Sequence, residues 1–300
     1  MNHLTRPQTI YQGWDIDRIK GLFARENWIG LNLDQRKDLL QEYANIRTEK
    51  MGMDFYPSLH LDEMDEGVGG SYLDGKIHMN INEVANDFRS TLTITGQMEN
   101  TEIKHSNFEA FETICHEHQH AYQDFVMRNK IDTDGQFLED MSVNDGIAMA
   151  KDYPYRISSL YILADANPLV YRLQPCENDA YVKSEMETYR LIEELEDRID
   201  LQSPANRESI ESYQKMRSIN GQEVIRNRAS LIYGVENPSQ VIKESLESIR
   251  AGNINKVPSS PLERDVLDSS LRTLELSNRN ENKLEDNIEV NKDIKWGLSL

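Results

Sequence analysis

Cysteine is scarce in this chain, and long apolar runs are missing from it. Two cysteines in 300 residues, Cys115 and Cys176, are too few for a disulfide scaffold and are typical of a reducing compartment. We expect two buried thiols, with a regulatory disulfide as the alternative. No apolar run approaches the ~20 residues of a membrane span, and the first residues lack the apolar segment of a secretory signal. These features predict a cytoplasmic protein, with export by a route that needs no such signal as the alternative.

Basic residues are also in the minority. The chain has 33 Lys and Arg against 52 Asp and Glu, a net charge of −19, and nearly all of the acidic excess lies within residues 1–200. Because no basic stripe is present to meet phosphates, we expect no nucleic-acid partner. An acidic surface is compatible with a basic peptide substrate, although it more often serves solubility. The 38% of hydrophobic residues are enough for a sizeable core.

One pentapeptide carries clear chemistry, His-Glu-His-Gln-His at residues 116–120. On a helix this HExxH pattern places His116 and His120 one turn apart on the same side, with Glu117 beside them. Two neutral imidazoles make half a zinc site, and the carboxylate is placed to accept a proton from water. The apolar residues share the opposite arc: Phe111, Ile114, Cys115, Ala121, Tyr122, Phe125 and Val126. The helix therefore has separate core and ligand faces.

The other two histidines near candidate elements have ordinary explanations. His118 falls within the apolar arc, so we expect a core imidazole that is hydrogen-bonded to the backbone rather than a ligand. His78 alternates outward on a predicted strand and is expected to be solvated.

A catalytic zinc site needs a third protein ligand, and Glu177 is the best candidate. It follows Pro175, which suits a helix start, and it shares an inward helical face with Ala180, Tyr181 and Leu191. A carboxylate on an inward face is costly unless it is paired or bound to a metal. The alternative is a glutamate that only complements the helix dipole.

Supporting residues are less specific. Carboxylates that accept the second N–H of a ligand histidine are expected among Glu109, Asp124 and Asp179. The alternative for each is a solvated surface acid. A donor to the developing oxyanion is also needed. Tyr181 is preferred because it lies one turn beyond Glu177, with weaker alternatives at Tyr122, Tyr153, Tyr155 and His105.

The remaining patterns predict the elements around this site. Helices are expected over residues 15–26, 32–49, 106–129, 157–166, 206–218, 221–233, 239–251 and 261–276, with Ser106 and Glu109 as a capping box and residues 277–300 as a frayed tail. A strand is expected at 58–61, and a hairpin at 71–73 and 76–81 around Asp74-Gly75. Ile77, Met79 and Ile81 should face the core, with His78 and Asn80 facing out. The exposed edge of Lys76–Ile81 is expected to pair with an extended peptide.

Taken together, residues 116–124 with Glu177 and Asp179-Ala180 resemble the gluzincin class of zinc metallopeptidases. The run from His116 to Asp124 is similar to the HExxHAxxD pattern of its thermolysin-like members. Glu177 follows His120 by 57 positions, and the next acidic residue comes two positions after the ligand rather than four. Both features depart from that family, so only the class is carried over. The resemblance implies Zn²⁺ held by the two histidines and Glu177.

The expected fold is therefore α+β, with a zincin-like core, a small mixed or antiparallel sheet and a largely helical carboxy-terminal region. The expected division is amino-terminal helices over 1–55, a catalytic core over 56–203 and helices over 204–300. The expected function is zinc-dependent peptide hydrolysis with Glu117 as general base. The alternatives are a delivered effector or toxin protease with one dedicated substrate, and a non-catalytic binding protein, which the intact Glu117 disfavours. A peptide deformylase is disfavoured because Cys115 adjoins His116 and cannot bind the same ion.

Overall fold

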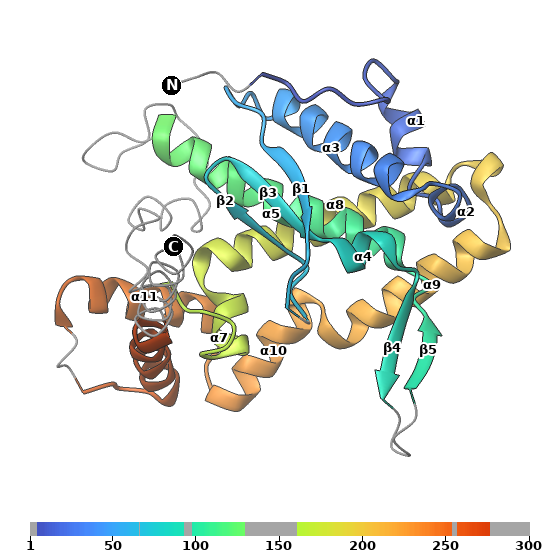
Figure 1. Ribbon diagram of the computed structural model, residues 1–300. Helices are drawn as coiled ribbons and strands as arrows, with labels where there is room; N and C mark the ends of the chain where they lie inside the picture. Colours follow the sequence, from blue (N-terminus) through green and yellow to red (C-terminus); the bar gives the residue numbers. More distant parts are fainter. Residues whose placement is uncertain (1–4, 66, 93–97, 130–160, 254–256, 277–300) are drawn as a thin grey trace, which may run out of the picture. The chain divides into compact units, whose positions relative to one another are not determined.

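The computed structural model describes residues 5–65, 67–92, 98–129, 161–253 and 257–276. The fold is α+β and mostly helical, with a small three-stranded mixed sheet (Figure 1). The described residues up to 129 together with 179–224 form one compact unit, and residues 161–178 with 225–276 form a second. These units interleave along the chain, whereas the sequence suggests consecutive segments. None of the described helices is long and apolar enough to cross a membrane.

The amino-terminal part of the first unit contains three helices, α1 (Ile16–Gly21), α2 (Arg25–Ile29) and α3 (Leu33–Lys50). The single helix predicted over 15–26 is wrong, because the chain turns at Leu22 and Ala24 is extended, with ψ of 138°. The helix predicted from Asn32 is confirmed. Asn32 and Gln35 form a reciprocal capping box that fixes where α3 begins.

The sheet contains β1 (Ser58–Asp62), β2 (Gly70–Leu73) and β3 (Lys76–Asn80). The predicted hairpin is confirmed, since Leu73 pairs with Lys76 across Asp74 and Gly75, which have φ values of 49° and 80°. Positive φ at both turn residues is the type I′ conformation that Asp-Gly favours. However, the strand order is β1-β3-β2, with β1 parallel and β2 antiparallel to β3. The predicted peptide-binding edge at Lys76–Ile81 is therefore wrong, because both edges of β3 are already paired.

The end of β3 also differs from the expected alternation. Ile77 and Met79 are buried as predicted, but Asn80 is buried too, and Ile81 begins the short helix α4 (Ile81–Ala85). The Asn80 side chain accepts from the backbone N–H of Asn82 and donates to the carbonyl of Val68. Asn80 thus caps a helix, which ends the strand alternation one residue earlier than predicted.

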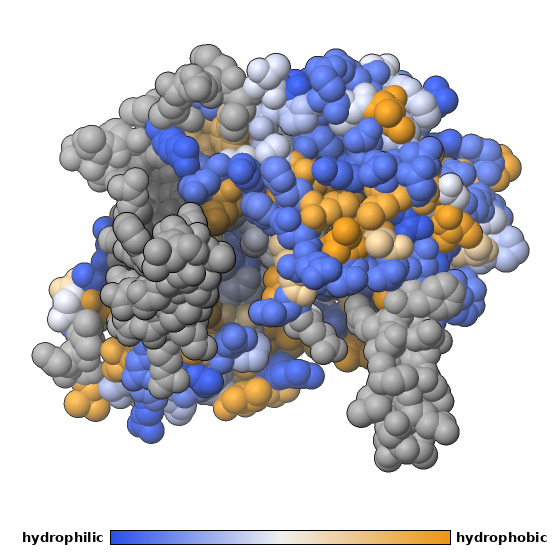
Figure 2. Space-filling view, viewed as in Figure 1, coloured by the Kyte–Doolittle hydropathy of each residue, from blue (hydrophilic) through white to orange (hydrophobic). Residues whose placement is uncertain are grey.

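Helix α5 (Ser106–Asn129) confirms the predicted motif helix and forms the centre of the first unit. The β1-β3-β2 sheet lies across it (Figure 1), and α3 packs against it as well. The ring centroid of Phe111 on α5 lies 4.8 Å from that of Phe23, in an edge-on arrangement, and 4.6 Å from that of Tyr43, in a tilted one. Such aromatic pairs add to the apolar burial that holds the helix in place. Hydrophilic residues cover much of the face shown in Figure 2, as the acidic composition leads one to expect.

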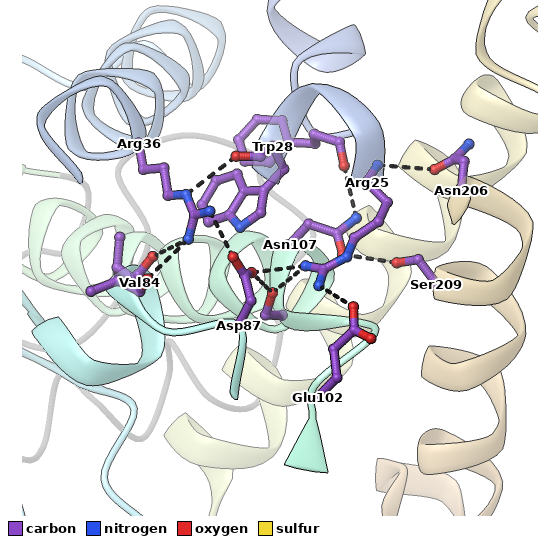
Figure 3. A network of polar contacts seen from close by, with 12 residues as sticks. Arg25, Trp28, Arg36, Val84, Asp87, Glu102, Asn107, Asn206 and Ser209 are labelled. Atoms are coloured by element: carbon purple, nitrogen blue, oxygen red, sulfur yellow. Dashed lines mark hydrogen bonds and ion pairs between the residues drawn. The ribbon is translucent and has the colours of Figure 1, made fainter. Parts of the chain in front are cut away.

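A second hairpin, β4 (Phe88–Leu92) with β5 (Met98–Glu102), was not predicted. A polar network fixes its base (Figure 3): Asp87 accepts from Arg25 at 2.8 Å, from Arg36 at 2.9 Å and from the Ser106 hydroxyl at 2.6 Å. The predicted capping box of Ser106 and Glu109 is therefore wrong. The Ser106 hydroxyl is engaged by Asp87 and Arg25, and Glu109 forms an ion pair with His105.

Most of the remaining helices follow the predicted boundaries closely. They are α7 (Pro168–Leu173), α8 (Pro175–Glu196), the 3₁₀ turn η1 (Ile199–Leu201), α9 (Pro204–Asn220), α10 (Gln222–Tyr233), α11 (Pro238–Arg250) and a helix over 261–276. Residues 161–166 are not helical, so the described part of the helix predicted over 157–166 is wrong. Residues 157–160 and the predicted tail, 277–300, lie outside the described residues. In the second unit, an apolar core joins α7, α10, α11 and the helix over 261–276.

Candidate metal centre

The two motif histidines face each other on α5. Nε2 of His116 lies 3.1 Å from Nε2 of His120, and the ring centroids are 4.8 Å apart at an angle of 82°. Their spacing of four residues places them on successive turns of one helix, as predicted. Both nitrogens therefore point toward the same small volume.

Glu177 completes a group of three possible metal ligands. One ligand atom from each of His116, His120 and Glu177 lies within 4.8 Å of the other two, and the Glu177 side chain has no exposed surface. Glu177 lies in the first turn of α8.

Asp179 fastens the first turn of α8 to α5. Its Oδ2 accepts from the side-chain amides of Gln119 at 2.8 Å and Gln123 at 2.9 Å, and all three side chains are buried. Glutamines four residues apart on α5 thus hold one carboxylate on α8. Glu177 precedes Asp179 by two residues in the same helix.

The donor set suits zinc. Two imidazole nitrogens and one carboxylate oxygen form a common ligand set of catalytic zinc sites, which leave a fourth position open. Ligand atoms ~2.0–2.1 Å from a tetrahedral zinc ion lie about 3.3 Å apart, close to the 3.1 Å between the two Nε2 atoms. The two imidazoles therefore already have the separation that a zinc ion requires.

A bonded chain through Gln123 fixes the tautomer of His120. A carboxylate only accepts hydrogen bonds, so the Gln123 group that faces Asp179 is the NH₂, and Oε1 is left facing Nδ1 of His120 at 3.0 Å. Nδ1 must then carry the hydrogen, which leaves Nε2 unprotonated toward the metal site. Asp179 therefore supports a ligand histidine as predicted, but through a glutamine rather than directly.

The other two predicted supporting carboxylates have different partners. Asp124 is buried and accepts from the Tyr72 hydroxyl at 2.9 Å and from Arg128 at 2.7 Å. Burial raises the pKa of Asp124 above its ordinary value, although the bonds with Tyr72 and Arg128 act to lower it. Glu109 forms its ion pair with His105 and lies seven residues before His116, about 10 Å along the helix. These contacts tie Asp124 to the hairpin strand β2 and leave Glu109 too far away to orient His116.

Of the predicted oxyanion donors, Tyr181 lies beside the site. Its ring centroid is 4.4 Å from that of His116, with an angle of 56°. His105 instead bonds to Ser212 of α9 at 2.8 Å, and Tyr122 lies near Phe125, with ring centroids 6.3 Å apart. Tyr153 and Tyr155 lie outside the described residues. Proximity favours Tyr181, and its role as a donor stays a prediction.

Glu117 is buried where β2 crosses α5. A methyl group on Gly70, the first residue of β2, would lie 2.9 Å from Cγ of Glu117 and 2.9 Å from the carbonyl oxygen of His78. Both distances are shorter than normal packing contacts. Only glycine lets the strand pass this close to the candidate base.

The other histidines of the described residues have partners within the fold. His118 is fully buried and hydrogen-bonded to the backbone of Ala44, as predicted, and it also contacts the side chains of Thr48 at 2.9 Å and Arg47 at 3.4 Å. Burial, assisted by the Arg47 charge, lowers the pKa of His118 well below its ordinary value and keeps the ring neutral. His78 is not simply solvated, because its Nδ1 lies 2.5 Å from Asp62 and its ring stacks on that of His60.

Neither cysteine forms a disulfide. Cys115 is buried, as predicted, and Cys176 is partly buried. Burial raises the pKa of the Cys115 thiol to about 12, which is the behaviour of an inert core thiol.

Sequence reasoning missed four residues that shape this site: Gln119, Gln123, Gly70 and Tyr161. The two glutamines each follow a ligand histidine by three residues, so an i,i+3 search for hydrogen-bonding partners on the motif helix would have found them. The Gly69-Gly70 pair before the hairpin is the sequence feature that could have indicated Gly70. The Tyr161 hydroxyl donates to Oε1 of Glu177 at 2.5 Å, and no local pattern indicates this pairing.

In comparisons with known proteins, this chain matches no protein-family model, no curated protein sequence and no solved structure.

Proposed function

We propose that this chain is a zinc-dependent peptidase in which His116, His120 and Glu177 hold the metal and Glu117 is the general base. The observation that carries this proposal is the convergence of the three side chains within 4.8 Å. His116 and His120 come from one turn of α5. Glu177 comes from α8, which begins at Pro175, 55 positions after His120. The adjacent Glu117 adds a base where water-activating chemistry needs one.

Each residue of the candidate site has its own role in the proposed reaction. When bound, Zn²⁺ polarises a carbonyl and lowers the pKa of water toward ~7. Glu117 accepts the proton of the attacking water and passes it to the leaving amine. Gln123 and Asp179 hold His120 in the tautomer that presents Nε2 to the metal. Tyr181, packed on the His116 ring, is the proposed donor to the oxyanion.

The substrate is proposed to be an extended polypeptide that pairs with β2 rather than β3. In the three-stranded sheet, β2 is an edge strand, and its first residue, Gly70, lies against Glu117. A peptide added to this edge would run alongside the candidate base, with main-chain hydrogen bonds supplying affinity. This moves the expected binding edge by one strand from the position predicted from the sequence.

The test combines metal content with cleavage. The purified chain should hold about one zinc ion, and His116→Ala should lose it. Glu117→Gln should retain zinc and lose roughly 10²–10⁴-fold in cleavage rate, measured from new peptide amino termini in a cell extract. Glu109→Gln is the matched control, because it removes a glutamate of the same helix that pairs with His105 instead of the site.

The alternatives give different results. Zinc binding by the wild-type chain without any new peptide ends would support a binding protein and refute the peptidase. New ends confined to one protein would identify a dedicated protease, whereas many would indicate a general one. Equal cleavage by wild type and Glu117→Gln would refute the assigned base.

A further inference from the structure

Tyr161 makes a direct contact with the proposed third ligand. Its hydroxyl lies 2.5 Å from Oε1 of Glu177, and because a carboxylate only accepts, the tyrosine is the donor. Glu177 is completely buried, so its two oxygens sit where orientation has a strong effect. A bond at Oε1 fixes the rotation of the Glu177 carboxylate, and it therefore also fixes the direction in which the second oxygen points.

The backbone next to Tyr161 is held by a buried glutamine. The Gln174 side chain accepts from the N–H of Ile162 at 3.1 Å and donates to the carbonyl of Ile162 at 2.9 Å. Gln174 immediately precedes Pro175, where α8 begins. This reciprocal pair joins the Tyr161 segment to the start of the helix that carries Glu177, so the tyrosine and the carboxylate share one support.

The carboxy-terminal helices hold the same segment from the other side. The N–H of Leu163 donates to the Thr273 hydroxyl at 3.1 Å, and Thr273, on the helix over 261–276, is buried. Ile162 is part of the apolar core of the second unit, with Ile225, Ala229, Ile242, Leu246, Leu262 and Val266. These residues come from α10, α11 and the helix over 261–276, which the peptidase proposal leaves without a role.

We infer that Tyr161 is a positioning residue for Glu177, and that the carboxy-terminal helices maintain the metal site by holding the Tyr161 segment. The inference rests on the proposed function for the identity of the metal, but it concerns affinity rather than cleavage. Partners of metal ligands typically contribute 10–100-fold to metal affinity. A merely structural tyrosine would change the stability of the fold and leave zinc affinity as it is.

The experiment measures the dissociation constant for Zn²⁺ of the full chain by competition with a chelator. Tyr161→Phe keeps the ring and removes the hydroxyl, and it should weaken zinc binding about 10–100-fold. The visible absorption of the Co²⁺-loaded protein should change as well, because the carboxylate is no longer oriented. Tyr233→Phe is the matched control, since it removes a tyrosine–carboxylate bond of 2.7 Å to Asp265 in the same unit, and it should leave both readings unchanged.

Each outcome decides the inference. Wild-type affinity and cobalt spectrum in Tyr161→Phe would overturn it, even if the chain is a zinc peptidase. Weakened binding in a chain that cleaves no peptide would support it while refuting the proposed function, and a wild-type chain that binds no zinc would overturn both. If Tyr161→Phe does not fold, Thr273→Val tests the same support. This variant should weaken zinc binding by roughly threefold, which is less than the loss expected from removing a residue that bonds directly to a ligand. Unchanged zinc affinity in Thr273→Val would overturn the role of the carboxy-terminal helices.

Discussion

Oε1 of Gln123 lies 3.0 Å from Nδ1 of His120, and this contact determines which imidazole nitrogen faces the candidate metal site. The opposite end of the same amide donates to Asp179 at 2.9 Å. One side chain therefore both orients a candidate ligand and joins α5 to α8. Four predictions follow from this and from other contacts of the described residues.

Replacing Gln123 should weaken the metal site more than it weakens the fold. Gln123→Leu removes the acceptor of the His120 N–H, so we expect zinc affinity to fall about 10–100-fold, measured by chelator competition. Gln119→Leu is the control, since it also removes a bond to Asp179 but leaves the Gln123 acceptor of the His120 N–H in place. If both variants lost affinity equally, Asp179 rather than the His120 tautomer would be the important feature.

A side chain at Gly70 should impair cleavage without removing zinc. Gly70→Ala places a methyl group 2.9 Å from Glu117 Cγ and from backbone of β3, so either the base or the strand must move. A displacement of this size lowers the rate by about 10²-fold, which a cleavage assay with zinc-saturated protein would measure.

The neighbouring glycine provides the control for this change. A methyl group on Gly69 meets chiefly Oε2 of Glu83, at 2.9 Å, which is the far end of a flexible side chain. Gly69→Ala should therefore cleave nearly as wild type does. Equal rates for Gly70→Ala and wild type would contradict the close packing of β2 on Glu117.

Asp87 should contribute to stability in a pH-dependent way. Burial raises the pKa of Asp87, but bonds from Ser106, Arg36 and Arg25 outweigh it and lower the pKa below the ordinary 3.8. A depressed folded pKa means that the contribution is present above about pH 4 and is lost as the pH falls further, because the unfolded state then binds the proton first.

Asp87→Asn should therefore cost about 1.5–3 kcal/mol at pH 7, measured by urea unfolding, and the difference from wild type should shrink below pH 4. Asp200→Asn is the control, since Asp200 forms an exposed pair with Arg198 and surface pairs contribute little. A difference that grew on acidification would show that the Asp87 network is not the source.

The two thiols should differ in reactivity. Cys115 is buried with its thiol pKa raised to about 12, whereas Cys176 is partly exposed. A thiol reagent such as DTNB should label Cys176 alone in the native chain and both cysteines after denaturation, because the thiolate is the reactive form. No labelling without a reductant would indicate the disulfide alternative.

Several elements were predicted from the sequence because short-range interactions determine them. The helix predicted from Asn32, the Asp74-Gly75 turn and the one-turn spacing of His116 and His120 each depend on residues within a few positions of one another. Local geometry suffices there. The capping box predicted at Ser106 was wrong because Asp87 and Arg25, which are distant in the chain, engage its hydroxyl. The single helix over 15–26 was wrong because amphipathic spacing does not reveal an extended residue at Ala24.

The candidate site shows the same division. The sequence by itself determined that His116, Glu117 and His120 share one helix face, and it offered Glu177 as the most suitable third ligand. Only the tertiary structure decided that, among the described strands, β2 and not β3 lies at an edge of the sheet, that Gln123 stands between Asp179 and His120, and that Tyr161 bonds to Glu177. The physical reason is that spacing along a helix is fixed by its 3.6-residue turn, whereas strand order and contacts between distant segments depend on how whole elements pack.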